Sequence, residues 1–107
     1  MLTLRGPGSP HQIAVLLRSD IADSAVSCEL AAEAERNGVF LLVFEKYYMR
    51  NSSRASLSVL VSGENGQTVV DAAASGGGQG SLFNFDWGAG GDFEDTVCRI
   101  LAPLGFS

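Results

Sequence analysis

Hydrophobic residues recur along this chain with two different periods. After Pro10, apolar residues return at intervals of three and four, which is the spacing of one helical face. A second stripe of this kind follows Asp92, a residue suited to capping a helix, and ends before Pro103 and Gly105. The pattern therefore predicts one helix near each end of the chain. The two stripes are Ile13, Leu16, Leu17 and Ile21, and Phe93, Val97, Ile100 and Leu101.

Between these helices the period is two, which predicts strands. Two Asn-Gly pairs, at residues 37–38 and 65–66, lie between alternating runs, and this is the strongest short signal for a β-hairpin. Residues 39–50 are rich in β-branched and aromatic residues and predict a long strand, apolar on both faces at its start and polar toward its end. Alternating runs over residues 55–63 and 67–75 predict the next two strands.

Residues 26–36 fit both periods. Their alanine and glutamate content favours a helix that ends at the first Asn-Gly pair, whereas their alternation favours a strand. We predict a strand, because the run from Val39 would otherwise lack a partner on one side. The glutamates that would then share one solvated, edge-protecting face are Glu29, Glu33 and Glu35.

These elements predict an α+β domain with a helix, a four-stranded antiparallel meander, a glycine-rich connection and a C-terminal helix. Both helices should cover the same apolar face of the sheet, because serines and glutamates occupy the other. The alternation of Phe83, Phe85 and Trp87 allows a short fifth strand, or these aromatics seal the core. Residues 1–9 fit a flexible N-terminal arm, and residues 10–107 a single domain.

Composition narrows the function classes. The chain has 107 residues, 46% of them hydrophobic, with a formal net charge of -5 from 7 Lys+Arg and 12 Asp+Glu. This content supports one core, and the acidic balance argues against nucleic acid as a partner. No apolar run approaches the ~20 residues of a membrane helix, and the first residues lack the apolar middle of a signal peptide. We therefore expect a cytoplasmic protein with no membrane partner.

Residues for metal or covalent chemistry are few. Cys28 and Cys98 lie far apart without CxxC spacing, and we interpret both as small core hydrophobes. His11 has no second histidine and no nearby cysteine, so no zinc site of ordinary composition can be assembled. No spacing joins a nucleophile to a base, so we expect no cofactor and lean away from an enzyme.

Several short motifs occur in a fixed order over residues 24–100. They are Glu45-Lys46-Tyr47-Tyr48, Arg54-Ala55-Ser56-Leu57, Ser75-Gly76-Gly77-Gly78-Gln79, and then Phe83, Trp87-Gly88 and Phe93. This ordered set resembles a small bacterial family known only as a domain of unknown function. The resemblance implies the same α+β fold and brings no activity, cofactor or partner with it. The family pattern has arginine at Lys46, serine at Gly78 and an acidic residue at Ala89, so a role for that acid is not implied for this chain.

Strand polarity yields the main site hypothesis. In a meander the second and fourth strands run the same way, so their ends lie at one rim of the sheet. Basic residues there meet the densest glycine loop. Glycines let successive backbone N–H groups turn toward one point, and arginine offers a fork suited to carboxylate or phosphate. The candidate ligand-binding residues of this rim are Lys46, Tyr48, Arg50, Arg54, Ser75, Gly76, Gly77, Gly78 and Gln79.

The same residues also have a purely structural interpretation. The glycines can form a turn or a bulge, and Lys46 can pair with cross-strand glutamates. Three classes of function stay open: a binding module for a small anion or a carboxylate-bearing partner, a structural protein that forms a homodimer through an open face or edge of the sheet, and an enzyme. We rank the binding or interaction module first and the enzyme last.

Overall fold

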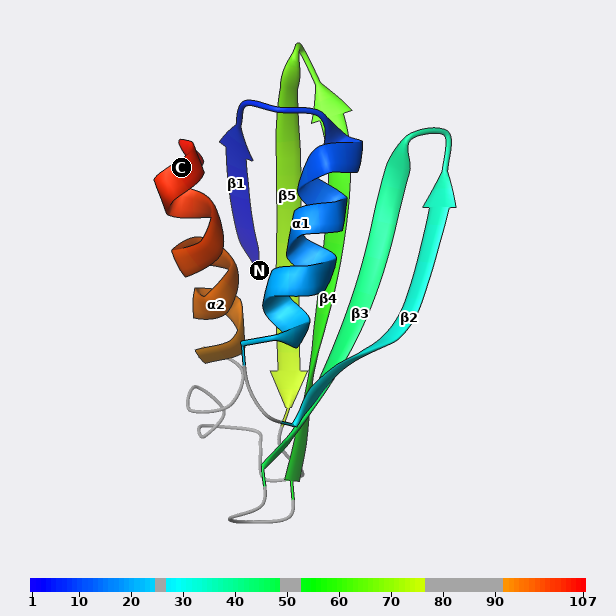
Figure 1. The fold of residues 1–107 in the computed structure, drawn as a ribbon, viewed down its shortest axis with the longest axis vertical. Helices are drawn as coiled ribbons and strands as arrows, with labels where there is room; N and C mark the ends of the chain where they lie inside the picture. The colour runs from blue at the N-terminus through cyan, green and yellow to red at the C-terminus, as the bar shows by residue number, and fades with distance from the viewer. Residues whose placement is uncertain (25–26, 49–52, 77–91) are drawn as a thin grey trace.

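The computed structural model describes residues 1–24, 27–48, 53–76 and 92–107 (Figure 1). These residues form two α-helices, five strands and a 3₁₀ turn. In chain order the elements are β1 (Leu2–Gly6), α1 (Pro10–Ala22), β2 (Cys28–Arg36), β3 (Val39–Tyr48), β4 (Ser53–Glu64), β5 (Gln67–Gly76), α2 (Asp92–Leu101) and the 3₁₀ turn Ala102–Leu104.

The strands form one antiparallel sheet in the order β1-β5-β4-β3-β2. Strands β2 to β5 make the predicted meander, and both helices lie against the same face of the sheet (Figure 1). The α+β architecture is thereby confirmed. We call the face opposite the helices the open face, because no element in the described part of the chain covers it. The short strand considered for residues 83–87 lies outside the described residues.

Strand β1 lies in the segment that the sequence predicts to be a flexible arm. Leu2 and Leu4 alternate with Thr3 and Arg5, so the two leucines pack against the core. The strand pairs with β5 along its whole length. The arm prediction is corrected here, because five alternating residues beside the Gly-Pro-Gly of residues 6–8 carry little signal by themselves. The partner that orders them is β5, more than 60 residues away in the chain.

Residues after α2 close the other side of β1. The N–H of Arg5 donates to the carbonyl of Ser107, and the N–H of Ser107 donates to the carbonyl of Arg5, each over 3.0 Å. A Cβ atom at Gly6 would lie 2.6 Å from the ring of Phe106, so the close approach there requires glycine. The outer edge of β1 is therefore occupied where Arg5 lies.

Two tight turns set the register of the meander, as predicted. The φ angles are 51° at Asn37, 80° at Gly38, 53° at Asn65 and 79° at Gly66. Two successive left-handed residues are typical of the type I′ turn, whose twist matches that of a hairpin. The strand assignment of β2, which the sequence left ambiguous, is confirmed along with both turns.

A β-bulge interrupts β2. Leu30 lies opposite Phe44, and Ala32 lies opposite Val43, so Ala31 is an extra residue on β2. Because side chains alternate along a strand, one extra residue exchanges the two faces for everything beyond it. Even-numbered residues of β2 therefore lie on the helix side before the bulge and on the open face after it.

The bulge overturns the prediction that Glu29, Glu33 and Glu35 share one solvated face. Glu29 lies on the open face, opposite Glu45. Glu33 and Glu35 lie on the helix side, where Glu33 reaches Arg18 of α1. Counting alternation along the sequence cannot detect the extra residue, because both Ala31 and Ala32 fit either face.

The core lies between the helices and the sheet. α1 begins with a capping box, in which the Ser9 hydroxyl accepts from the N–H of Gln12 and the Gln12 side chain accepts from the N–H of Ser9. Both predicted helical stripes supply the core. Its fully buried large side chains include Leu17, Ile21, Phe44, Leu57, Val59, Val61, Phe93, Val97 and Leu101.

Candidate functional site

The rim predicted from strand polarity exists, at the end of the sheet where β3 and β5 terminate. β3 and β5 end there together, since Lys46 lies opposite Ala55 and Ala55 lies opposite Gly76. Tyr48 is the last residue of β3. The remaining rim candidates, Arg50, Gly77, Gly78 and Gln79, lie outside the described residues.

The basic residues of the described rim lie on opposite faces of the sheet. Lys46 is on the helix side, with its Nζ 5.3 Å from the centroid of the Phe93 ring. Arg54 is on the open face, and its Nη1 lies 3.6 Å from Oε1 of Glu45. The two basic groups therefore do not point toward one shared ligand.

Ser75 also lies on the open face, away from Lys46. Its hydroxyl is 3.1 Å from that of Ser56, the residue directly opposite it on β4. Within the described residues, the rim thus offers two separate polar positions rather than one cradle. The anion site that would include the glycine loop stays a prediction.

Near the rim, Cys28, Lys46 and Ala55 are cross-strand neighbours on β2, β3 and β4. Burial raises the pKa of the Cys28 thiol, although the nearby charge of Lys46 acts in the opposite direction. Cys28 and Cys98 are both half-buried and form no disulfide. Cys28 packs against the core, as its interpretation as a small core hydrophobe predicts. Among the described residues, no group of three or more histidines, cysteines and acids could hold a metal ion.

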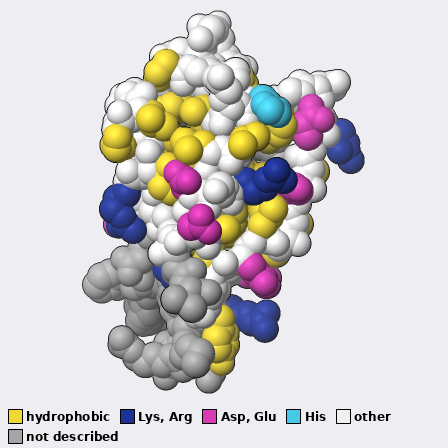
Figure 2. All heavy atoms as spheres, viewed as in Figure 1, with side chains coloured by type: hydrophobic (Ala, Val, Ile, Leu, Met, Phe, Trp, Pro, Cys, Tyr) yellow, Lys and Arg dark blue, Asp and Glu magenta, His cyan; other side chains and the backbone are white. Residues whose placement is uncertain are grey.

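A groove that the sequence analysis missed lies on the helix side. It has a volume of about 340 Å³ and separates α1 from the β2–β3 hairpin. On this side of the molecule, charged side chains of both signs are interspersed among hydrophobic ones (Figure 2). His11 and Arg18 both line the groove from α1, and their spacing of seven residues, two helical turns, is the only sequence signal that could have indicated it.

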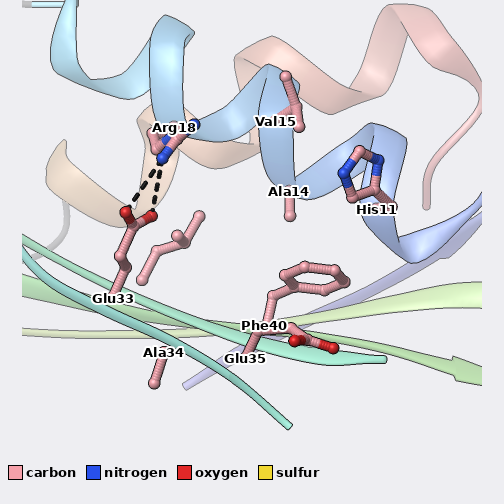
Figure 3. A pocket seen from close by; sticks show the side chains of 9 residues that line it. His11, Ala14, Val15, Arg18, Glu33, Ala34, Glu35 and Phe40 are labelled. Atoms are coloured by element: carbon pink, nitrogen blue, oxygen red, sulfur yellow. Dashed lines mark hydrogen bonds and ion pairs between the residues drawn. The ribbon is translucent and has the colours of Figure 1, made fainter. Parts of the chain in front are cut away.

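The charged side chains of the groove have partners within the chain, and Figure 3 shows the pair of Arg18 and Glu33. Nη1 of Arg18 donates to both carboxylate oxygens of Glu33 over 3.0 Å. The carboxylate of Glu35 accepts from the N–H of Gly38 over 2.9 Å. The His11 ring stands edge-on to Phe40, with 5.8 Å between ring centroids. The groove is therefore lined by one arginine and two glutamates around an apolar floor, and its lining residues include no serine, cysteine or lysine.

The open face carries the larger apolar surface. Leu41 of β3 and Leu60 of β4 lie directly opposite each other and are 39% and 38% exposed. Ala34 lies opposite Leu41 on β2, and Figure 3 shows its side chain pointing away from α1. We define the open-face patch as Ala32, Ala34, Val39, Leu41, Val43, Leu60 and Ala73.

Charged residues lie on both sides of the open-face patch along the strands. Toward the hairpin turns lie Arg5, Arg36 and Glu64, with Arg5 Nη2 3.9 Å from Glu64 Oε1. Toward the rim lie Glu29, Glu45 and Arg54. The open face thus has an apolar centre on β2, β3 and Leu60 of β4, with charged residues toward both ends. One acid lies in the central row, because Asp71 of β5 is directly opposite Leu60, and its carboxylate accepts from the Thr3 hydroxyl.

Comparison with known proteins places the chain without assigning it an activity. No curated protein matches it, and no solved structure matches it. No helix in the described part of the chain is long and apolar enough to cross a membrane. A family model does match, over residues 1–105. The chain therefore belongs to the family of unknown function DUF6054.

Proposed function

We propose that this protein is an interaction module that acts as a homodimer, with the open face as the interface between the two copies. The observation that carries the proposal is the pair Leu41 and Leu60, which stand exposed at the centre of an uncovered sheet. Contiguous exposed apolar surface on a folded domain marks an interaction site more often than an isolated hydrophobic residue does.

The residues around this pair suit a flat partner. Ala32, Ala34 and Ala73 are small, and Ser56, Ser58 and Ser62 line the open side of β4. A face of this kind can approach a second sheet at the ordinary spacing of about 10 Å. A second copy of this chain supplies such a sheet with the same small and aliphatic side chains.

The edges of the sheet favour association through the face rather than by strand addition. At the β1 edge, the backbone of Arg5 is already bonded to Ser107. Beyond β1, the carboxylate of Glu94 accepts from the N–H of Ala74 over 3.0 Å, which occupies the edge of β5. At the β2 edge, the bulge at Ala31 interrupts regular pairing. Bulges and occupied edges are ordinary protection against edge-to-edge pairing.

The size of the molecule limits the interface that the open face can form. The molecule measures 42 × 22 × 22 Å along its principal axes, so the outline of its long side is roughly 900 Å². Standard protein interfaces bury about 800 Å² on each partner. Because the outline is an upper limit for the open face, the proposed dimer must use most of that face to reach the ordinary range.

Two free thiols in the described residues also support the cytoplasmic location that the sequence predicts, because reducing compartments keep cysteines unpaired. We include this location in the proposal. It is compatible with a module whose dimer depends on apolar contact rather than on disulfide bonds.

The test is the mass of the protein in solution. Sedimentation equilibrium is expected to give twice the chain mass of 11.2 kDa for the unaltered protein and the single chain mass for Leu41→Glu. Leu104→Glu is the matched control, since Leu104 is 45% exposed but lies in the 3₁₀ turn after α2. This control should remain a dimer. A monomeric unaltered chain at about 100 µM, or a dimer that survives Leu41→Glu, would reject the proposal.

A further inference from the structure

We infer that the two copies are related by a two-fold axis that runs across the strands, level with the gap between Ser58 and Leu60. The inference rests on the proposed dimer, and it specifies which residues of one copy face which residues of the other. The observation behind it is the arrangement of charge on the open face.

Opposite charges occur in pairs on the same strand. On β2, Arg36 and Glu29 both lie on the open face, on either side of the bulge. On β4, Glu64 and Arg54 both lie on the open face, near the two ends of the strand. Each pair has one member toward the hairpin turns and one toward the rim.

The register shows that both pairs share one midpoint. Glu29 is level with Ser56 through Glu45, and Arg36, opposite Val39, is level with Ser62. The midpoint of this pair on β4 lies between Ser58 and Leu60. Arg54 and Glu64 lie equally far from the same point along β4. Two independent charge pairs therefore give the same position for an axis.

A two-fold axis across the strands at this level lays each strand over its own copy in the reverse direction. Arg36 then faces the partner's Glu29, and Glu64 faces the partner's Arg54. Symmetry repeats each contact, because an isologous interface uses the same patch on both copies. The dimer would thus gain four contacts between opposite charges around its apolar centre.

The apolar centre also matches itself in this arrangement. Leu41 faces the partner's Val43, and Ala34 faces the partner's Ala32. Leu60 faces the smaller side chain of the partner's Ser58, so a large residue meets a small one. Sheets packed face to face keep their strand directions within about 30°, and the long arginine and glutamate side chains at the ends can span that angle.

The arrangement also accounts for an unfavourable feature of the single chain. Glu29 and Glu45 lie directly opposite each other on β2 and β3, and like charges in this position destabilise a sheet. Arg54 of the same chain already lies 3.6 Å from Glu45, which leaves Glu29 as the acid to be neutralised. In the dimer, the partner's Arg36 faces Glu29.

The alternative axis, along β4, does not give this match. It places Arg36 over the partner's Arg5, because both residues lie toward the turns on opposite edges of the sheet. It also places Leu41 over the partner's Asp71, whose carboxylate accepts from the Thr3 hydroxyl over 2.6 Å. Like charges in contact disfavour this second arrangement. The axis across the strands places Asp71 over the partner's Ala73 instead of a leucine, so the carboxylate covers less apolar surface.

Charge reversal tests the axis, using sedimentation equilibrium at low ionic strength. Arg36→Glu alone and Glu29→Arg alone are each expected to weaken the homodimer by about tenfold or more, because each creates two like-charge contacts. An equimolar mixture of the two variants should recover the affinity of the unaltered protein, because both contacts in the mixed dimer are then attractive. The controls are Asp20→Arg on α1 and Arg99→Glu on α2, which make the same charge changes away from the open face.

The outcomes separate the axis from the dimer itself. A mixture no tighter than its components, or an Arg36→Glu variant that binds itself more tightly, overturns the axis across the strands. The second result supports the axis along β4, since it would convert repulsion from Arg5 into attraction. If the unaltered chain is a dimer that Leu41→Glu dissociates while the charge variants match their controls, only the axis falls. If the unaltered chain is a monomer, the proposed function falls with it.

Discussion

The two faces of the sheet are built from the same strands but meet different surroundings. On β3, Phe44 is fully buried beneath the helices, whereas Leu41 on the opposite side is 39% exposed. On β4, Leu57 is fully buried, whereas Leu60 is 38% exposed. The helix-covered face therefore forms a complete core, and the open face carries side chains of a similar kind without a cover.

This difference indicates what β3 is suited to. A strand with one solvated side normally alternates apolar and polar residues, whereas a strand covered on both sides is apolar throughout. Residues 39–44 are apolar without interruption. β4 alternates instead, with serines at three open-face positions. The apolar open side of β3 is therefore the strongest indication that a second protein layer covers the open face.

The largest expected effect separates the two faces by stability. Phe44→Ala should lower the free energy of unfolding by about 3–5 kcal/mol, because it removes a fully buried ring and leaves a cavity. Leu41→Ala should lower it by less than about 1 kcal/mol in dilute solution, where the open face contacts only water. Urea denaturation of both variants measures the comparison.

Concentration provides the control for this comparison. Because a dimer stabilises the folded chain by mass action, the cost of Leu41→Ala should grow as the protein concentration rises. The cost of Phe44→Ala should change far less, since Phe44 lies on the helix side in either state. If Phe44→Ala does not fold, Phe44→Leu tests the same comparison with a smaller cavity. Equal losses of unfolding free energy on the two faces in dilute solution would contradict the proposed difference between them.

Local signals in the sequence predict much of this fold. The Asn-Gly turns at residues 37–38 and 65–66 and the two helical stripes depend on neighbours in the chain, and all were predicted. β1 depends on a distant partner, and the bulge at Ala31 depends on which of two alanines is extra. The groove depends on how α1 packs over the β2–β3 hairpin, and no local sequence pattern predicts that packing.

The candidate rim shows the same limit. Strand polarity correctly brings the ends of β3 and β5 to one edge of the sheet. Which face a side chain takes depends on register to within one residue, and Arg54 lies opposite Tyr47 rather than Lys46. Polarity places residues along an edge, whereas register decides whether they converge.

A deletion in β2 tests how the two faces are kept apart. Deleting Ala31 should change the free energy of unfolding by less than about 1 kcal/mol, because regular pairing then leaves Glu29 on the open face and Glu33 beside Arg18. Deleting Ala34 is the matched control. The turn fixes Arg36 opposite Val39, so this second deletion moves Glu33 to the open face and removes its ion pair.

Urea denaturation and the solution mass together measure this pair of deletions. The Ala31 deletion should keep both the stability and the dimer, because the open-face patch is unchanged. The Ala34 deletion should lose more stability and should place a carboxylate beside Leu41, which weakens the dimer. If the Ala31 deletion is the more damaging of the two, the bulge does more than exchange the faces.

The smallest expected effect concerns the thiol of Cys28, which lies on the helix side near the rim. Because burial raises its pKa, less thiolate is present at a given pH, and alkylation should be slower than for an exposed cysteine. The pH dependence of stability has the same origin. The contribution of the neutral thiol to the free energy of unfolding is complete below the pKa of the unfolded chain and is lost as the pH rises through the pKa of the folded chain.

Lys46→Met should raise the pKa of Cys28 further and slow alkylation several-fold, since the Lys46 charge favours the thiolate. The rate is measured in a Cys98→Ser background, with Arg54→Met as the control on the open face. Equal slowing by both substitutions would show that the sheet does not separate the two charges.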